Sequence, residues 1–145
     1  MSKKPDPVRP ADDEARALGK RLMSEARHGA LGVLIDGEPV VSRIAVATTP
    51  HGLITLISDL SQLTVALRAA PDASILLGEP GKGDPVAHPR ITLQITAEFL
   101  EKSKDIADAY LALQPKASLY VGFTEFKFVA LRPRSAYLNG GFGKE

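Results

Sequence analysis

Short β-rich stretches separated by turn signals follow one another along most of this chain. Residues 30–35 are apolar, the Asp36-Gly37 pair after them is a strong hairpin signal, and the chain then returns as a second strand. A further turn signal at 49–52 adds a third strand, so the pattern begins as an antiparallel meander. The expected strands cover residues 30–35, 40–48, 53–58, 74–77, 90–100 and 126–131, and the last resumes at 136–138. Antiparallel strands leave exposed edges unless the sheet closes, so this pattern predicts a small six-stranded antiparallel β-barrel.

Helical periodicity appears at three places between these stretches. Residues 15–27 repeat apolar side chains at helical spacing behind a cap at Asp12 or Asp13, and further helices are expected over 60–70 and 104–113. Because these helices do not alternate regularly with the strands, the pattern excludes a doubly wound parallel sheet. The expected fold class is mainly β with α (α+β), with helices flanking the barrel.

The length of 145 residues suits one domain. Residues 1–10 carry three prolines and little apolar surface to bury, so we expect a flexible N-terminal tail there. The single domain is then expected over residues 11–145.

The charge balance argues against partners that are bound by charge alone. Lys and Arg number 18 and Asp and Glu 17, so the net charge is +1 and there is no broad basic field for nucleic acid or an anionic membrane. The chain has no cysteine, which suits the reducing cytoplasm, and no stretch approaches the ~18 uncharged apolar residues of a membrane span. We therefore expect a cytoplasmic protein with no nucleic-acid partner and no membrane partner.

Motifs for metal binding and for nucleophilic catalysis are not apparent. His28, His51 and His88 lack the mutual spacing of metal ligands, and the sequence has no Gly-x-Ser-x-Gly elbow. We expect no metal site, and the catalytic residues stay unassigned.

Arg43 is the charged residue of an otherwise apolar strand. Strand alternation puts Val41, Ala45 and Ala47 on the same face as Arg43, and Val40, Ile44 and Val46 on the other face, which suits a core. A flat ring could lie on the alanines while the guanidinium holds a phosphate through two parallel hydrogen bonds. The alternative is an arginine that pairs with a carboxylate or extends along the barrel wall, and both interpretations stay open.

Residues 58–64 read Ser-Asp-Leu-Ser-Gln-Leu-Thr and join the third strand to the second helix. Free backbone amides and hydroxyls at a helix N-terminus form an anion site. The alternative is an ordinary helix cap, and Asp59 disfavours a phosphate directly beside it.

A loop rich in glycine and proline, residues 78–85, leads through His88-Pro89-Arg90 into the fifth strand. Arg90 is a candidate cofactor contact. Equally, Asp84 and Arg90 could tie the loop down.

These segments, taken in order, resemble the FMN-binding split-barrel proteins related to pyridoxamine 5'-phosphate oxidase, and among them the haem-utilisation (HugZ-like) branch. The matching segments are residues 41–48, 56–61, 76–85, 88–94 and 137–143. The most specific is Gly-Glu-Pro-Gly-Lys-Gly-Asp-Pro followed by His-Pro-Arg, at 78–85 and 88–90.

The resemblance implies a split barrel that forms a homodimer, with FMN at the subunit interface. It implies a phosphate-binding role for Arg43, a ring-facing backbone at Ile44, Ala45 and Val46, a phosphate-side turn at Ser58, Asp59, Ser61, Gln62 and Thr64, and a ring contact at Arg90. Gln62-Leu63 departs from the Arg-Lys pair of the oxidases. Each lost charge-assisted hydrogen bond is worth about 1.5–3 kcal/mol, so FMN binding is expected to be weaker here.

The function we expect is that of an FMN-binding flavoprotein, an FMN-dependent oxidoreductase acting on a small-molecule redox substrate. One alternative is a haem-binding or haem-utilisation protein, and another is a non-enzymatic flavin-binding module. Haem-handling members extend into a further C-terminal domain, whereas this sequence ends at Glu145, which favours the flavin.

Overall fold

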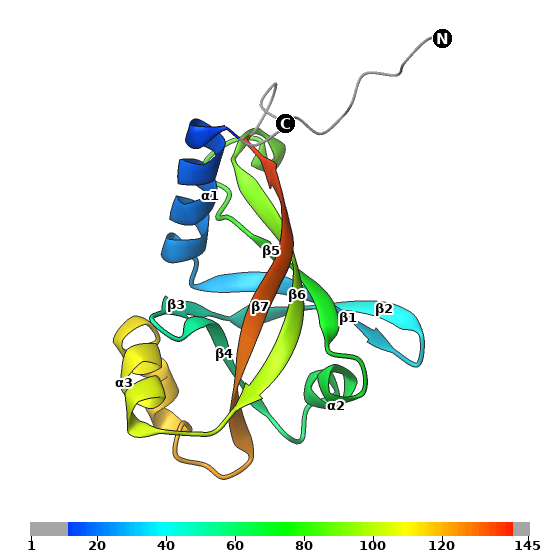
Figure 1. Ribbon diagram of the computed structural model, residues 1–145, viewed down its shortest axis with the longest axis vertical. Coiled ribbons are helices and arrows are strands. Elements are labelled where there is room, and N and C mark those ends of the chain that lie inside the picture. Colours follow the sequence, from blue (N-terminus) through cyan, green and yellow to red (C-terminus); the bar gives the residue numbers. More distant parts are fainter. Residues whose placement is uncertain (1–11, 141–145) are drawn as a thin grey trace.

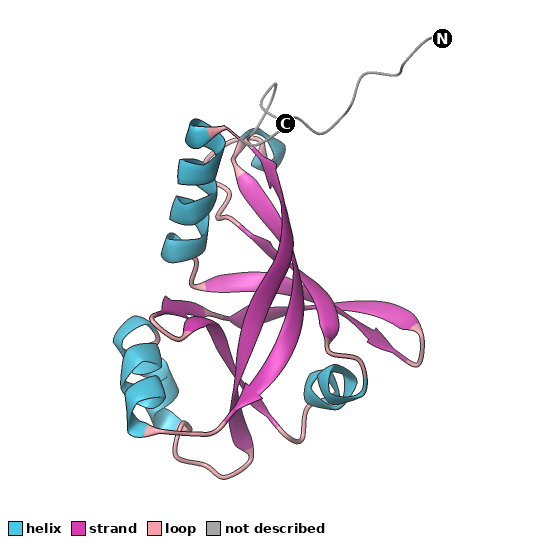
Figure 2. Cartoon of the chain, viewed as in Figure 1, coloured by secondary structure: helices cyan, strands magenta, loops and turns pink. Residues whose placement is uncertain are grey.

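The computed structural model describes residues 12–140, which form one curled antiparallel sheet flanked by helices (Figures 1 and 2). The helices are α1 (Asp13–Glu25), α2 (Gln62–Ala69) and α3 (Lys104–Leu113), with short 3₁₀ turns η1 (Pro85–Ala87) and η2 (Pro115–Leu119). The strands are β1 (His28–Ile35), β2 (Glu38–Ala45), β3 (Ala47–Thr49), β4 (Gly52–Ser58), β5 (Asp72–Leu77), β6 (Arg90–Leu100) and β7 (Phe126–Asn139). The tail expected over 1–10 and the last residues of the matching segment 137–143 lie outside the described residues.

The sheet order is β2-β1-β5-β6-β7-β4-β3, which gives seven strands where six were expected. The difference arises at Val46, where the stretch expected as one strand over 40–48 is interrupted. The Val46 N–H donates to the Arg27 carbonyl at 2.9 Å, and its carbonyl accepts from Gln114 Nε2 at 2.8 Å. Val46 therefore leaves the strand ladder, and the single expected strand becomes β2 and β3.

This interruption also closes the barrel. β2 forms one edge of the sheet and β3 the other, so both edges belong to the continuous segment 38–49. The Thr55 hydroxyl on β4 donates to the Ala45 carbonyl at the end of β2, at 2.7 Å. The two edges are thus joined by the chain and by a side-chain hydrogen bond, as the prediction of a split barrel with flanking helices requires.

The longest strand pairing joins β6 to β7. β7 unites the segments expected separately at 126–131 and 136–138, although Pro133 lies between them. A register shift between Gln94 and Ile95 on β6 occurs where Pro133 pairs with Ile95. Proline lacks the N–H that a regular ladder needs, and an irregular register is where a strand accommodates it.

Two hydrophobic clusters lie on opposite faces of the curled sheet. The larger fills the barrel with β1, β5 and β6 side chains such as Leu31, Ile75 and Leu93, and α1 and α2 pack against it. The smaller lies between α3 and the strands β3, β4 and β7, and contains the buried pair Tyr110 and Phe128.

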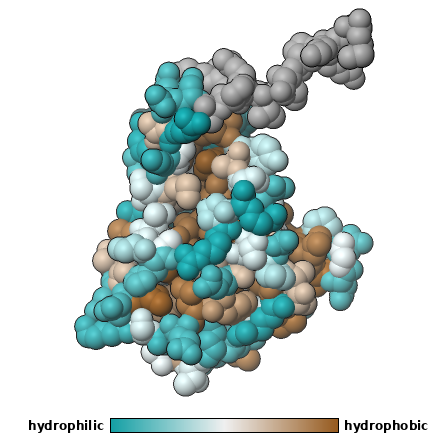
Figure 3. Space-filling model, viewed as in Figure 1, coloured by the Kyte–Doolittle hydropathy of each residue, from teal (hydrophilic) through white to brown (hydrophobic). Residues whose placement is uncertain are grey.

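The β1–β2 hairpin extends away from the barrel (Figure 1), and hydrophobic residues reach its surface (Figure 3). The expectation that Val40 belongs to the core is therefore wrong, since its side chain is 37% exposed, whereas Ile44 and Val46 are buried as expected. Val40 lies on the edge strand β2, and its directly paired neighbour Val33 on β1 is the residue buried in the core at this level.

Candidate functional site

Arg43 lies on the outer face of the sheet, away from the barrel core. It is paired directly with Ala30 on β1, and Ala30 is paired with Leu76 on β5. Directly opposed residues of antiparallel strands point to the same face, so these three side chains form a row. The row crosses a shallow hollow of about 160 Å³, which is lined by His28, Gly29, Ala30, Arg43, Leu76 and Gly78.

The Arg43 side chain is exposed and has no hydrogen bond or ion pair with any residue between 12 and 140. The interpretation in which Arg43 pairs with a carboxylate of the described chain is therefore not what the structure shows. A guanidinium has a fixed fork of donors that matches a phosphate or a carboxylate. Arg43 thus offers these donors to a ligand in the hollow.

The floor of the hollow consists of small residues. Ala45 lies on the Arg43 face as expected, directly opposite His28, but it does not line the hollow. Ala47 is fully buried under α3 in the smaller cluster, so the expectation that it flanks Arg43 on an open face is wrong. Ala30, Gly29 and Gly78 supply the floor instead. These residues come from β1 and from the end of β5, so strand register, which the sequence does not show, brings them beside Arg43.

Two of these glycines are required by close packing. A Cβ on Gly29 would lie 2.8 Å from Leu77 Cδ2, and a Cβ on Gly78 would lie 2.8 Å from the Pro89 carbonyl oxygen. Gly78 also has a φ of +126°, which side-chain-bearing residues rarely adopt. A side chain at residue 29 would collide with the core residues Ile75 and Leu77, and one at residue 78 would collide with the backbone of Pro89 and Arg90, so the packing around the hollow requires glycine at both positions.

A second hollow of about 150 Å³ continues from the first and shares Leu76 and Gly78 with it. Its remaining lining residues are Pro80, Pro85, His88, Pro89 and Arg90, from the loop between β5 and β6. The two hollows form one shallow surface, with Arg43 at one end and Arg90 at the other.

Arg90 ties the loop down, as one of its two expected roles requires, and it also lines the second hollow. Its Nη1 donates to the carbonyls of Val86 and His88, at 2.9 and 3.3 Å, and so ties the loop down while Arg90 lines the hollow. Asp84 does not pair with Arg90. Its carboxylate accepts from the Val86 N–H at 2.9 Å and caps η1.

The segment 58–64 forms a tightly bonded turn that caps α2. The Ser61 hydroxyl accepts from the Leu63 N–H, and the Ser58 hydroxyl accepts from the Leu60 N–H, each at 3.1 Å. Thr64 is buried, and its hydroxyl donates to the Ser58 carbonyl at 2.5 Å. The three hydroxyls therefore serve the turn itself, as in the helix-cap interpretation.

Two other candidates on this turn differ in what they contact. The Asp59 carboxylate lies 3.2 Å from Arg68 and 3.5 Å from Lys127, whereas the Gln62 side chain is exposed. None of the residues 58–64 lines either hollow.

The strand residues next to Arg43 are held by internal contacts. Ile44 and Val46 are buried, and the carbonyls of Ala45 and Val46 accept hydrogen bonds from Thr55 and Gln114. These contacts fix the backbone that carries Arg43.

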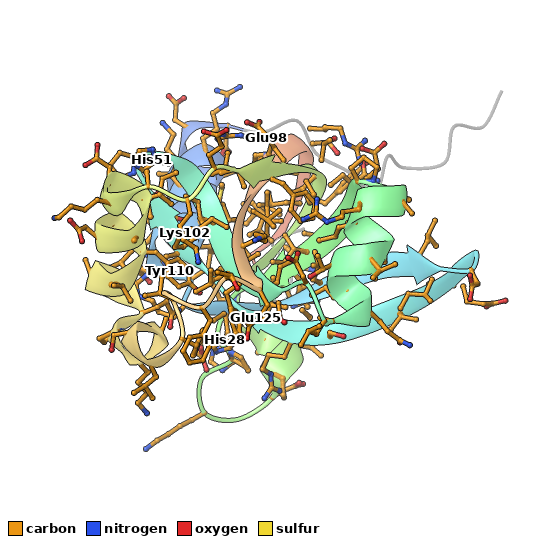
Figure 4. The ribbon with its side chains drawn as sticks, turned by 90° about the horizontal axis from the view of Figure 1, so that it is seen from below. His28, His51, Glu98, Lys102, Tyr110 and Glu125 are labelled. Carbon is orange, nitrogen blue, oxygen red and sulfur yellow. The ribbon has the colours of Figure 1, made fainter. Side chains whose placement is uncertain are left out.

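His28 is a lining residue that the sequence did not single out for ligand binding. Its Nε2 lies 2.7 Å from the Glu79 carboxylate, beside the Arg43 hollow. His28 and His51 lie far apart in Figure 4, and no group of three or more potential metal ligands occurs within residues 12–140. Register and a long-range contact identify His28, and neither leaves a local signal in the sequence.

Comparisons with known proteins identify close structural relatives. A scan of protein-family models and a search of curated proteins each found no match. One solved structure shares 37% sequence identity with a TM-score of 0.88, covering 93% of this chain and 91% of that one. A protein of unknown function from Agrobacterium tumefaciens shares 25% identity (TM-score 0.81), with 94% of this chain and 62% of that one covered.

A haem-binding protein from Mycobacterium smegmatis shares 28% identity with a TM-score of 0.79, covering 94% of this chain. This chain spans 57% of the length of that protein. More distant matches, at 18–20% identity, include a haem storage protein from Vibrio cholerae and an FAD-binding protein from Mesorhizobium loti, and they show the shared fold. In the described residues, no helix is long and apolar enough to cross a membrane.

Proposed function

This chain belongs to the split-barrel family related to pyridoxamine 5'-phosphate oxidase, in its haem-utilisation (HugZ-like) branch, and from that premise we propose that it is an FMN-binding flavoprotein. The observation that carries the proposal is Arg43. Its guanidinium has no ionic partner in residues 12–140 and borders a flat floor of small residues. A phosphate matches the guanidinium, and a planar ring system matches the floor.

Several residues of the outer face would each bind a different part of the cofactor. Arg43 would hold the phosphate, and the backbone around Ile44, Ala45 and Val46 would support the ring system. Within residues 12–140 the loop carbonyls engage only Nη1 of Arg90, so its remaining donors would be available to the cofactor. When bound, FMN supplies the redox chemistry, and the protein binds and orients it.

The turn at 58–64 would contribute less to phosphate binding than in the oxidases. Thr64 already donates its hydroxyl proton within the turn, and Asp59 already has two cationic neighbours. The Ser58 and Ser61 hydroxyls accept hydrogen bonds there, so each would offer a phosphate only one uncharged O–H donor. Gln62 has an exposed side chain and would donate one uncharged hydrogen bond in place of a charged one. We therefore propose that Arg43 carries most of the phosphate affinity.

A second copy of the chain would cover the outer face. Leu34, Val41, Leu76 and Tyr137 are large hydrophobic residues exposed on it, and both hollows open beside Leu76. Exposed hydrophobic patches on a folded domain mark interaction surfaces. We propose a homodimer that encloses the cofactor at this interface, and an oxidoreductase activity on a small-molecule substrate.

Haem binding is the second candidate function, and the relative from Mycobacterium smegmatis favours it. A haem would use the same flat floor, and its carboxylates would pair with Arg43 or Arg90. An axial histidine would be needed as well, and His28 is the histidine on the floor beside Arg43.

Visible absorption spectroscopy separates the two candidates. The purified protein is incubated with FMN or with haemin and passed through a desalting column. Retention of the twin-banded yellow spectrum supports the flavin, whereas a retained Soret band without retained flavin supports haem. Retention of neither would overturn both.

A further inference from the structure

His28 and Glu79 form an imidazole–carboxylate pair at the edge of the Arg43 hollow. The Nε2 atom of His28 lies 2.7 Å from the Glu79 carboxylate, although 50 residues separate them in the sequence. His28 lines the hollow, and Glu79 follows Gly78, which lines it too. Both side chains are substantially exposed, at 44% and 76%, so a ligand can reach them.

Strand register fixes where this pair lies relative to Arg43. Arg43 is directly opposite Ala30, and His28 lies two residues before Ala30 on the same face of β1. Residues in this diagonal relation lie about 7–8 Å apart. The pair is therefore too far from Arg43 to contact the same group of a ligand. It would contact the part of the ligand next to the group that Arg43 holds.

The chemistry of the pair selects uncharged, hydroxyl-bearing ligand groups. A carboxylate only accepts hydrogen bonds, and the second imidazole nitrogen can accept or donate one. A hydroxyl group satisfies both because it donates and accepts. A second anionic group would be repelled by Glu79, so the negative charge of the ligand belongs at Arg43.

We propose that His28 and Glu79 bind the hydroxyl groups of the ligand whose phosphate is held by Arg43. The hollow then selects a phosphate ester of a polyhydroxylated chain. This inference rests on the proposed function, because the chain that joins the phosphate of FMN to its ring carries such hydroxyls. Haem has none.

The test compares two flavins that differ only in those hydroxyls. One is FMN, and the other is a flavin whose phosphate is attached through a plain alkyl chain. Affinity is measured by the change in flavin fluorescence on titration with wild-type protein and with the His28→Phe, Glu79→Gln and His51→Phe variants. His51 lies in the β3–β4 turn, away from both hollows, and serves as the matched control.

The hydrogen bond to the His28 ring is uncharged and worth about 0.5–1.5 kcal/mol, whereas Glu79→Gln keeps an acceptor oxygen and removes only its charge. We therefore expect H28F to weaken FMN binding about tenfold and E79Q about threefold. Neither variant should change the affinity for the alkyl analogue by more than about twofold, and H51F should leave the affinity for both ligands unchanged.

The remaining outcomes are distinguishable. Equal losses for FMN and for the analogue would mean that the pair only shapes the hollow, and unchanged FMN affinity would mean that it does not reach the ligand. Either result overturns this inference and leaves FMN binding intact. Failure of the wild-type protein to bind either flavin overturns the proposed function, and this inference with it.

Discussion

Arg43 on β2 and Ala30 on β1 face each other across the hairpin, and Ala30 in turn faces Leu76 on β5. The Arg43 guanidinium has no ionic partner in residues 12–140. The small residues beside it in this row form a flat surface on one side of it. Because Arg43, Ala30 and Leu76 share one face, the two faces of this part of the sheet have different roles. Along β1, β2 and β5, the inner face packs in the barrel core, whereas the outer face presents donors and a floor to a ligand.

Dimerisation through the outer face should depend on Val41. Its side chain is 69% exposed on the hairpin, and a glutamate there would place a charge in the proposed interface. We expect Val41→Glu to shift the protein from dimer to monomer in analytical ultracentrifugation. Val65 on α2 is 63% exposed and lies outside that face, so Val65→Glu should remain dimeric. A dimeric V41E protein, or a wild-type monomer, would contradict the proposed interface.

Gly78 should be intolerant of any side chain. An alanine Cβ would collide with the Pro89 carbonyl and with Arg90, at a φ of +126°. Strain of this kind destabilises a fold by about 2–3 kcal/mol, and urea denaturation of Gly78→Ala should show such a loss. Gly83 has a φ of +87° with nothing within 4 Å of a Cβ, so Gly83→Ala should cost only about 1 kcal/mol. Equal losses would mean that the collision is relieved by movement of the loop.

Tyr110 should make the fold sensitive to alkaline pH. Burial between α3 and the sheet raises the pKa of Tyr110 above its ordinary value of 10.0. The unfolded chain therefore loses this proton first, so the stabilisation is complete below pH 10 and is lost as the pH rises above it. The loss approaches about 1.4 kcal/mol per pH unit. The free energy of unfolding of the wild type and of Tyr110→Phe is measured from pH 9 upwards. The variant should lack the part of the decrease with pH that Tyr110 causes, and identical slopes for the two proteins would refute this prediction.

Elements with local signals were predicted well from the sequence. The helix expected over 104–113 is α3 to the residue, because Ser103 caps its start and Pro115 follows its end. The Asp36-Gly37 turn likewise produced the β1–β2 hairpin, with both residues at positive φ.

Features that depend on distant contacts were not predicted. Val46 leaves the sheet because Arg27 and Gln114 bind its backbone, and Gln114 lies 68 residues away. The small residues beside Arg43 were predicted only in part for the same reason, since Ala45 lies on the Arg43 face and Ala47 does not. Ala47 belongs to α3's cluster, and only the register of β1 and β5 shows that Ala30 and Gly78 take its place.

The central claim is that Arg43 holds the phosphate of FMN. The most direct measurement is a titration of the wild-type protein and Arg43→Ala with FMN and with riboflavin, which lacks the phosphate. We predict that the wild type binds FMN at least about tenfold more tightly than riboflavin, and that R43A binds both alike, since a charge-assisted hydrogen bond is worth about 1.5–3 kcal/mol. R43A should keep wild-type stability to within about 0.5 kcal/mol, because the side chain contacts no ionic or hydrogen-bonding partner in residues 12–140. A stable R43A protein that still prefers FMN to riboflavin by the wild-type factor would contradict the account.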